Sequence, residues 1–263
     1  MGYTISYICV SHRGLCRQTH QDNFLCGGQI LPPGTNGTPD ALTGTLPSGP
    51  DAIFGVFDGM GGEEMGEMGA YLAAREAMNT RLEGEPKERF LDFCRRANES
   101  LTEYTRSHHL SAMGTTASVL SFTEQGIWLC HLGDSRIYRL REGKLTRLTA
   151  DQVLPWFPGR KPPLALYLGI PQEEEVFTPQ ILRLMPQAED IYLLCSDGLT
   201  DMVSRDEIQH ILNTTPYDKA AEALLSKALS NGGRDNVTVI TCKTQESARI
   251  PMFIKRLFRK PIV

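Results

Sequence analysis

The sequence predicts an α+β domain in which β-sheets are covered by pairs of helices. Strand-like segments come first, followed by two long helices, more strands, two more helices and a last strand. There is no regular alternation of strand and helix, and no Gly-x-Gly-x-x-Gly sequence follows a strand. A doubly wound nucleotide-binding fold is therefore disfavoured. The chain has 263 residues, 41% of them hydrophobic, which is enough to form a substantial core.

In the first half of the chain, apolar and β-branched residues predict strands at 3–10, 23–26 and 53–57. Residues 27–50 are rich in Gly, Pro, Thr and Ser without periodicity, which predicts a loop inserted between two strands. Apolar residues then recur at helical spacing over 65–82 and 90–104, the second segment with a proline near its start. We expect two amphipathic helices there.

The second half begins with β-type segments. Strands are expected at 115–122, 126–132 and 135–140, and a hairpin turn at 141–144 precedes another short strand. Residues 150–175 contain five prolines and look irregular. A strand at 191–195 follows, then helices at 205–213 and 218–230, with Asp218 as the expected N-cap of the latter. The last predicted strand covers 237–240.

Composition narrows the class of protein. The net charge of −4 speaks against nucleic acid as a partner, because phosphate binding needs a positive field. No apolar run approaches the roughly 20 residues of a membrane span, and residues 2–4 lack the layout of a signal peptide. The seven cysteines include no Cys-x-x-Cys pair, which favours buried reduced thiols in a cytoplasmic protein. The histidines show no zinc-ligand spacing.

Aspartates at the ends of apolar strands are the distinctive chemical feature. One Asp-Gly pair is ordinary turn chemistry, but four aspartates at strand ends lie beside a glycine or a turn: Asp58, Asp134, Asp197 and Asp235. Carboxylates that share a site repel one another unless a cation lies among them. The segment after Asp58 opens with two glutamates, so no basic side chain is expected to neutralise it. Oxygen-only ligands select Mg²⁺ or Mn²⁺, which predicts a divalent metal centre.

Seven motifs in series carry a family resemblance. They are Arg17 with Gln21-Asp22, 56–62 (VFDGMGG), 114–117 (GTTA), 131–138 (HLGDSRIY), 148–151 (LTAD), 196–201 (SDGLTD) and 233–238 (GRDNVT). In this order, across nearly the whole domain, they resemble a metal-dependent protein phosphatase of the PPM, or type 2C, family, in its bacterial serine/threonine form. The resemblance implies a four-layer α-β-β-α sandwich of two antiparallel sheets, with metals in a cleft at one end.

The resemblance also implies roles for individual residues. Asp58 would bridge two Mg²⁺ or Mn²⁺ ions, with the Gly59 carbonyl on the second, and Asp197 and Asp235 would hold the first. Asp22 would hold the second ion through water, whereas Asp134 with Asp197 would form a weaker third site. Arg17 would grip the substrate phosphate, for which its planar fork is suited.

The implied reaction is hydrolysis of phosphoserine and phosphothreonine on proteins. A water that bridges two ions would attack phosphorus in line, so no covalent phospho-enzyme is needed. The catalytic set would then be Asp58, Asp197 and Asp235. The implied partner is a phosphoprotein substrate, and the enzyme would oppose a Ser/Thr kinase in signalling, as a monomer.

Two departures from the family pattern bear on this prediction. Met60 stands where many animal members have a histidine proposed to protonate the leaving group, so water would do that here. Gln21 stands where many members have Glu; this change is also seen in bacterial-type members, so we expect it to be tolerated. The flap near 150–170 has an unusual Val-Leu-Pro-Trp-Phe-Pro run at 153–158, so substrate preference is where the family is the weakest guide.

The phosphatase domain is expected to cover residues 1–245, followed by a basic and hydrophobic tail at 246–263. The tail has five basic residues and no acidic one from 249 onwards. Docking of this tail to a membrane or a partner remains an alternative, but a packed or frayed tail is favoured. Two rival functions also stay open, a binding module without catalysis and a hydrolase of small phosphate esters.

Overall fold

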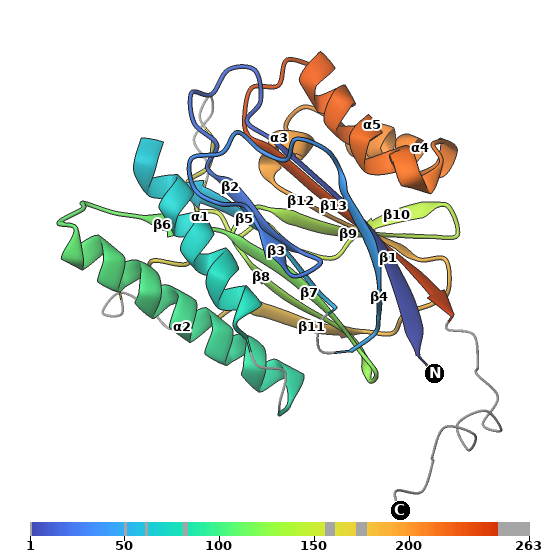
Figure 1. Cartoon of the computed structure of the whole chain (residues 1–263), viewed down its shortest axis with the longest axis horizontal. Coiled ribbons are helices and arrows are strands. Elements are labelled where there is room, and N and C mark those ends of the chain that lie inside the picture. Colours follow the sequence, from blue (N-terminus) through green and yellow to red (C-terminus); the bar gives the residue numbers. More distant parts are fainter. Residues whose placement is uncertain are drawn as a thin grey trace, which may run out of the picture.

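Two antiparallel sheets lie face to face, with helices on both outer faces (Figure 1). The computed structural model describes residues 2–49, 52–60, 63–80, 84–155, 161–171 and 178–246. In spatial order, the six-stranded sheet contains β10 (Lys144–Arg147), β9 (Arg136–Arg141), β12 (Ile191–Cys195), β13 (Val237–Glu246), β1 (Tyr3–His12) and β4 (Leu42–Pro47). The seven-stranded sheet contains β11 (Gln180–Leu184), β8 (Gly126–Leu132), β7 (Ala117–Thr123), β5 (Ile53–Met60), β2 (Asp22–Cys26) and β3 (Gln29–Ile30), with β6 (Gly114–Thr115) paired to β5.

Each sheet is covered by one pair of helices. The helices α1 (Glu63–Met78) and α2 (Pro86–Ser107) share a hydrophobic cluster with the seven-stranded sheet. On the other side, α4 (Arg205–Thr214) and α5 (Tyr217–Ser230) share a second cluster with the six-stranded sheet. A single helical turn, α3 (Asp197–Thr200), follows β12. The predicted α+β sandwich with its α-β-β-α layers is confirmed.

The third hydrophobic cluster fills the space between the two sheets. Its centre contains three aromatic rings packed edge to face. The centroid of Phe122 lies 5.7 Å from that of Phe54 and 5.6 Å from that of Tyr192. Phe54 and Phe122 belong to the seven-stranded sheet and Tyr192 to the six-stranded one, so these rings join the two layers. Such pairs stabilise by about 0.5–1.5 kcal/mol each beyond the area they bury.

The helix boundaries follow from local chemistry. Ser204 caps α4 through its side chain, which accepts a hydrogen bond from the Glu207 amide, and the Glu207 carboxylate in turn accepts one from the Ser204 backbone amide. Asp218 was expected to cap the following helix, but α5 begins at Tyr217 with Pro216 at the N-cap. Asp218 instead lies in the first turn, where a carboxylate interacts favourably with the positive end of the helix dipole.

The prediction of a loop over residues 27–50 is wrong in two places. β3 forms a short hairpin with β2, and β4 pairs with β1 over six residues as the outer strand of its sheet. The exposure of β4 alternates along its length, but its inward residues are only partly buried. Because no position of β4 needs to be fully buried, four of its six residues are Thr, Gly or Pro, and the alternation of apolar and polar residues is not recognisable in the sequence. β11, another edge strand, was also missed.

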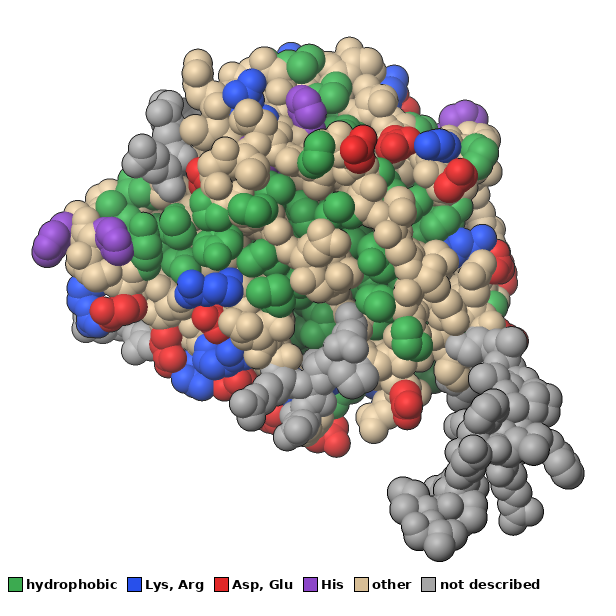
Figure 2. Space-filling model, viewed as in Figure 1, with side chains coloured by type: hydrophobic (Ala, Val, Ile, Leu, Met, Phe, Trp, Pro, Cys, Tyr) green, Lys and Arg blue, Asp and Glu red, His purple; other side chains and the backbone are tan. Residues whose placement is uncertain are grey.

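The exposed face of α2 carries several ion pairs. In Figure 2, acidic and basic side chains alternate over this helix. Arg95 is ion-paired with Asp92 and Glu99 at distances of 2.7 and 3.0 Å, and Arg96 with Asp92 at 2.9 Å. Exposed pairs of this kind contribute only a few tenths of a kcal/mol each, so the helix is stabilised chiefly by its buried face.

The closest backbone approach in the α1 layer is at Gly59 of β5. A Cβ at this position would lie 1.9 Å from the carbonyl oxygen of Gly66 in α1 and 2.7 Å from that of Gln21. The start of α1 can therefore pack on β5 only because both residues that meet there are glycines.

Replacement of Gly59 by Ala should lower the free energy of unfolding by about 2–3 kcal/mol, since the new methyl group meets backbone that cannot rotate away. Thermal unfolding of the metal-free protein would measure this. The control is Gly49→Ala, because a Cβ at Gly49 has no neighbour within 4 Å. If the two variants unfold at the same temperature, the close approach of α1 to β5 does not limit stability.

Parts of the predictions lie outside the described residues. These are the tail beyond residue 246, residues 156–160 of the expected flap and the glycines at 61–62. No helix in the described ranges has the length and apolar character needed to cross a membrane.

Candidate metal centre

Two carboxylates face each other on adjacent strands of the seven-stranded sheet. Asp22 begins β2 and is the register partner of Asp58 in β5. The backbone of Asp58 is fixed from the opposite side, because its amide donates to Thr116 Oγ1 at 3.0 Å and its carbonyl accepts from Thr115 Oγ1 at 3.0 Å. Asp58 thus lies within a strand rather than after it, since β6 extends the pairing of β5 beyond the carboxylate.

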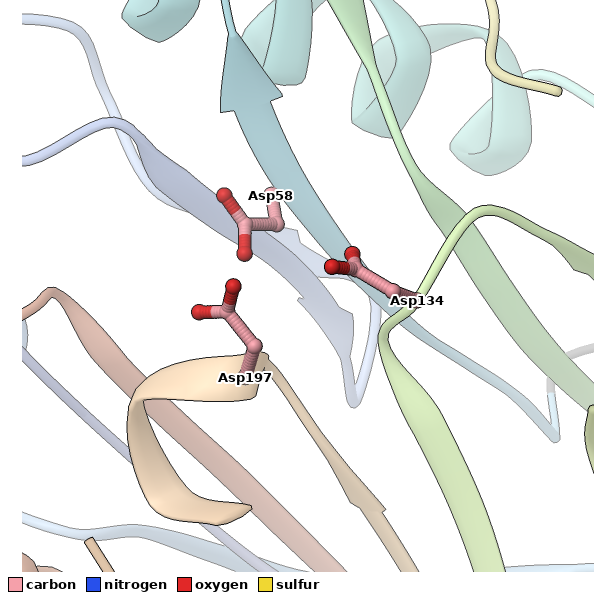
Figure 3. Close-up of side chains that lie close together, drawn as sticks. All are labelled: Asp58, Asp134 and Asp197. Carbon is pink, nitrogen blue, oxygen red and sulfur yellow. The ribbon is translucent and has the colours of Figure 1, made fainter. Parts of the chain in front are cut away.

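Three carboxylates converge at this point (Figure 3). One oxygen each from Asp58, Asp134 and Asp197 lies within 4.8 Å of the others. Asp134 lies in the turn between β8 and β9, where the chain passes from one sheet to the other. Asp197 is the first residue of α3 and belongs to the six-stranded layer. The cluster therefore forms at the seam between the two sheets.

Asp197 is brought to the seam by a close backbone contact. A Cβ on the next residue, Gly198, would lie 2.0 Å from the carbonyl oxygen of Asn236. Only glycine lets α3 turn this tightly against the start of β13. The Asp197 carbonyl accepts from the Asp201 amide at 2.8 Å, which closes the turn and leaves the side chain directed at Asp58 (Figure 3).

Asp235 lies just before β13 and is held by a neighbour from the other end of the chain. Arg17 Nη2 donates to its Oδ2 at 2.7 Å. The next residue, Asn236, is 4% exposed and binds the segment that carries Arg17 and Asp22: its Oδ1 accepts from the Gln21 amide, and its Nδ2 donates to the Arg13 and Thr19 carbonyls. One asparagine thereby fixes the loop between β1 and β2.

Burial of so many carboxylates raises their affinity for protons. The pKa of Asp58 is raised well above its usual value, first by burial and then by the charges of Asp22 and Asp134. Burial also raises the pKa of Asp22 to about 7, although hydrogen bonds from Ser196 and Thr238 oppose the rise. The pKa of Asp134 is raised mainly by burial. These groups lack sufficient positive charge from the protein itself, so the donor set fits a divalent cation.

The cluster opens into a cleft of about 520 Å³. In the described chain its lining includes four carboxylates (Asp58, Asp134, Asp197, Asp235) and two cations (Arg17, Lys161). The expectation that no basic side chain would neutralise Asp58 is wrong, because the charge of Lys161 acts on it. Lys161 Nζ forms an ion pair with Asp197 and lies 3.6 Å from Asp134 Oδ2. It was missed because it is 27 residues from the nearest of these aspartates in sequence order, Asp134, and belongs to no recognisable motif.

The structure brings together most of the residues that the sequence singled out. Asp58, Asp134 and Asp197 form the cluster, and Asp22 lies beside it. Arg17, Gly59 and Asp235 line the same cleft. Sequence reasoning assigned no chemical role to Thr238, Ser11 or His20, which lie behind Asp22. Their signal, a polar residue in a strand with buried neighbours, is too common to single out a site.

The carboxylate oxygens gathered in this cleft form a candidate site for divalent cations. The family model for protein phosphatase 2C matches residues 38–231. The chain belongs to the protein phosphatase 2C family.

Curated relatives carry matching names. The chain is 31% identical over 251 residues to the serine/threonine protein phosphatase PstP of Mycobacterium tuberculosis, a match that covers 90% of this chain but 44% of PstP. The chain thus spans less than half the length of that relative. It is also 32% identical over 209 residues to the serine/threonine phosphatase stp of Listeria monocytogenes, covering 70% of this chain and 81% of stp.

Solved structures agree with the fold. The crystal structure of M. tuberculosis PstP matches with a TM-score of 0.75 and 27% identity, over 92% of this chain and all of that one. The PstP catalytic domain in complex with two manganese ions matches with a TM-score of 0.73 and 28% identity, over 93% of this chain and all of that one.

Proposed function

We propose that this protein hydrolyses phosphoserine and phosphothreonine on proteins, with Mg²⁺ or Mn²⁺ as cofactor. The observation that carries the proposal is the convergence of Asp58, Asp134 and Asp197 within 4.8 Å in a cleft that also holds Arg17. Oxygen donors alone suit hard divalent ions, and a guanidinium beside them suits a phosphate. Family membership and the names of the relatives support the same activity.

The proposed ligand sets are those that the resemblance to the family implies, and the position of these residues at the seam supports them. Asp58 would bridge two ions, with the Gly59 carbonyl on one of them. Asp197 and Asp235 would complete the first site and Asp22 the second, through water. The two manganese ions in the PstP structure support a two-ion centre. Asp134 with Asp197 would form a weaker third site.

Two bound ions would lower the pKa of a water placed for in-line attack and would offset charge on the phosphate oxygens. The protein itself would hold the proposed ligands in place. Thr115 and Thr116 hold the Asp58 backbone, and the Thr116 hydroxyl is in turn 2.7 Å from Ser135 Oγ. Thr116, a hydroxyl residue of the cleft, is thus engaged in structural hydrogen bonds, which favours direct attack by water over a covalent phospho-enzyme. Met60 has no proton to give, so water would protonate the leaving oxygen.

The test is hydrolysis of a phosphothreonine peptide with Mn²⁺, with Mg²⁺ and with EDTA. Turnover that requires the metal is the expected result. A protein that binds neither ion and releases no phosphate would instead be a binding module. Faster release from small phosphate esters than from the phosphopeptide would make it a metabolite hydrolase.

We further propose that it acts as a cytoplasmic monomer that opposes a Ser/Thr kinase.

Replacement of Arg17 by Ala should raise KM for a phosphopeptide about ten- to thirtyfold, the loss expected for one charge-assisted hydrogen bond to phosphate. Its guanidinium is half exposed and already paired with Asp235, so it can turn one edge to a substrate. Arg17→Lys should recover only part of the loss, because an ammonium cannot contact both groups in a plane. If KM is unchanged in both variants, Arg17 serves only the ion pair with Asp235.

A further inference from the structure

A chain of side-chain hydrogen bonds runs from Asp22 into the interior. Thr238 Oγ1 donates to Asp22 Oδ2 at 2.8 Å, Ser11 Oγ lies 2.7 Å from Thr238 Oγ1, and His20 Nε2 lies 2.8 Å from Ser11 Oγ. Ser196 Oγ also donates to Asp22 Oδ2, at 2.7 Å. All five residues are at most 2% exposed. Such a buried polar network is kept only when its members satisfy one another.

The chain of hydrogen bonds crosses between the two sheets. Asp22 belongs to β2 of the seven-stranded sheet. Ser11 and Thr238 are register partners on β1 and β13 of the six-stranded sheet. The Thr238 amide also donates to Ser196 Oγ at 3.0 Å, so both hydroxyls that reach Asp22 are fixed to the same strand. The carboxylate of one sheet is thus held by hydroxyls of the other.

The direction of every hydrogen bond in the chain is determined by the carboxylate. When Asp22 holds a cation its carboxylate is ionised and only accepts, so the Thr238 hydroxyl then donates to it. A hydroxyl has one proton, so Thr238 then accepts from Ser11, and Ser11 accepts from His20. His20 must therefore carry its hydrogen on Nε2. In the described part of the protein its buried Nδ1 has no hydrogen-bond partner, while the Asn236 side chain lies near the ring.

Both hydroxyl donors on Asp22 use the same oxygen. Oδ2 accepts from Thr238 and from Ser196, whereas neither hydroxyl donates to Oδ1. Two donors on one oxygen fix the rotation of the carboxylate about its Cβ–Cγ bond. Oδ1 is then the oxygen that remains for an ion or for water on that ion. Groups behind a metal ligand commonly set its orientation in this way.

We infer that Thr238 and Ser11 are positioning residues for Asp22, with His20 as the terminal donor of the chain. They act on the second ion through Asp22 and touch neither ion nor substrate. The inference rests on the proposed function, because it assigns Asp22 to the metal centre. Its consequence is that metal affinity depends on hydroxyls of the opposite sheet and on an imidazole buried in the loop between β1 and β2.

The test compares Thr238→Val with Thr238→Ser by calorimetric titration with Mn²⁺. Valine keeps the shape of threonine but cannot donate, so Mn²⁺ binding at one core site should weaken about 10- to 100-fold. Serine keeps the hydroxyl and should bind Mn²⁺ within about threefold of the wild type. The Mn²⁺ concentration that gives half-maximal turnover should rise by a similar factor in Thr238→Val, because the defect lies in ion binding.

The inference is overturned if Thr238→Val binds Mn²⁺ like the wild type, or if serine is as poor as valine, since packing alone would then explain the loss. A wild-type protein that binds no Mn²⁺ would instead overturn the proposed function. The two failures are therefore distinguishable by the wild-type titration.

A second measurement does not depend on whether the Thr238 variants fold. In the wild type, ¹⁵N NMR should show His20 as the tautomer with hydrogen on Nε2. His20→Gln, whose amide nitrogen can donate from a similar position, should retain more Mn²⁺ affinity than His20→Leu. Hydrogen on Nδ1 in the wild type, or equal Mn²⁺ affinity in the two variants, would show that His20 does not donate to Ser11.

Discussion

Replacement of Asp58 by Asn should reduce metal-dependent turnover of a phosphothreonine peptide by about a thousandfold or more, the scale of losing a principal electrostatic contribution to catalysis. Asp58 lies between Asp22 on the neighbouring strand and the oxygens of Asp134 and Asp197. An amide offers one neutral oxygen, so it cannot bridge two ions as a carboxylate does. Phosphate release at saturating Mn²⁺ would measure the effect.

The matched control is Asp40→Asn, which makes the same change on an exposed carboxylate outside the cleft. It should leave turnover within about twofold of the wild type, as surface substitutions usually do. Full activity in Asp58→Asn would show that the two-ion assignment is wrong. Loss of activity with Mn²⁺ binding unchanged would move Asp58 from ion binding to a role in the chemical step.

The same substitution should stabilise the metal-free protein, increasingly so as the pH rises. Because the pKa of Asp58 is raised in the folded state, the folded protein retains a proton that the unfolded chain has released. Stability of the wild type is therefore lost as pH rises above the usual carboxyl range of about 4. Asparagine has no proton to lose. The advantage of Asp58→Asn should therefore be smallest near pH 4 and should grow steadily as the pH rises towards 8.

The measurement is the difference in denaturant unfolding between the two proteins in EDTA. A difference is needed because two buried histidines act in the opposite direction. Burial lowers the pKa of His20 and of His131 to about 4, so their contribution to stability is lost as pH falls below about 6.5. Their effect cancels between wild type and variant. A constant difference across this pH range would show that Asp58 does not carry the excess proton. Added Mn²⁺ should reverse the order of stability, because the wild type binds it more tightly.

The layers of this fold could be predicted because its helices and central strands bury clear apolar faces. β12, for example, is buried at all five positions and was expected at the same residues. The edge strands β4 and β11 could not, because half-exposed strands need few apolar residues. The turn α3 was also missed, since four residues give no helical period.

The candidate site was predictable as a set of residues but not as an arrangement. Asp-Gly pairs after apolar strands pointed to Asp58, Asp134 and Asp197, and the structure places them together. The pairing of Arg17 with Asp235 joins residues 218 positions apart, and no local pattern contains it. The position of Lys161 near Asp134 was equally unpredictable, because no local sequence pattern links this lysine to the aspartates.

Because the cluster lies at the seam, the proposed ligands come from both sheets. Asp22 and Asp58 move with one sheet, whereas Asp197 and Asp235 move with the other. The distance between the two sets of ligands is therefore fixed by the thickness of the layer between the sheets, where Phe54, Phe122 and Tyr192 interlock. Side chains that lie away from the cleft would thereby help to set the distance between the two groups of proposed ligands.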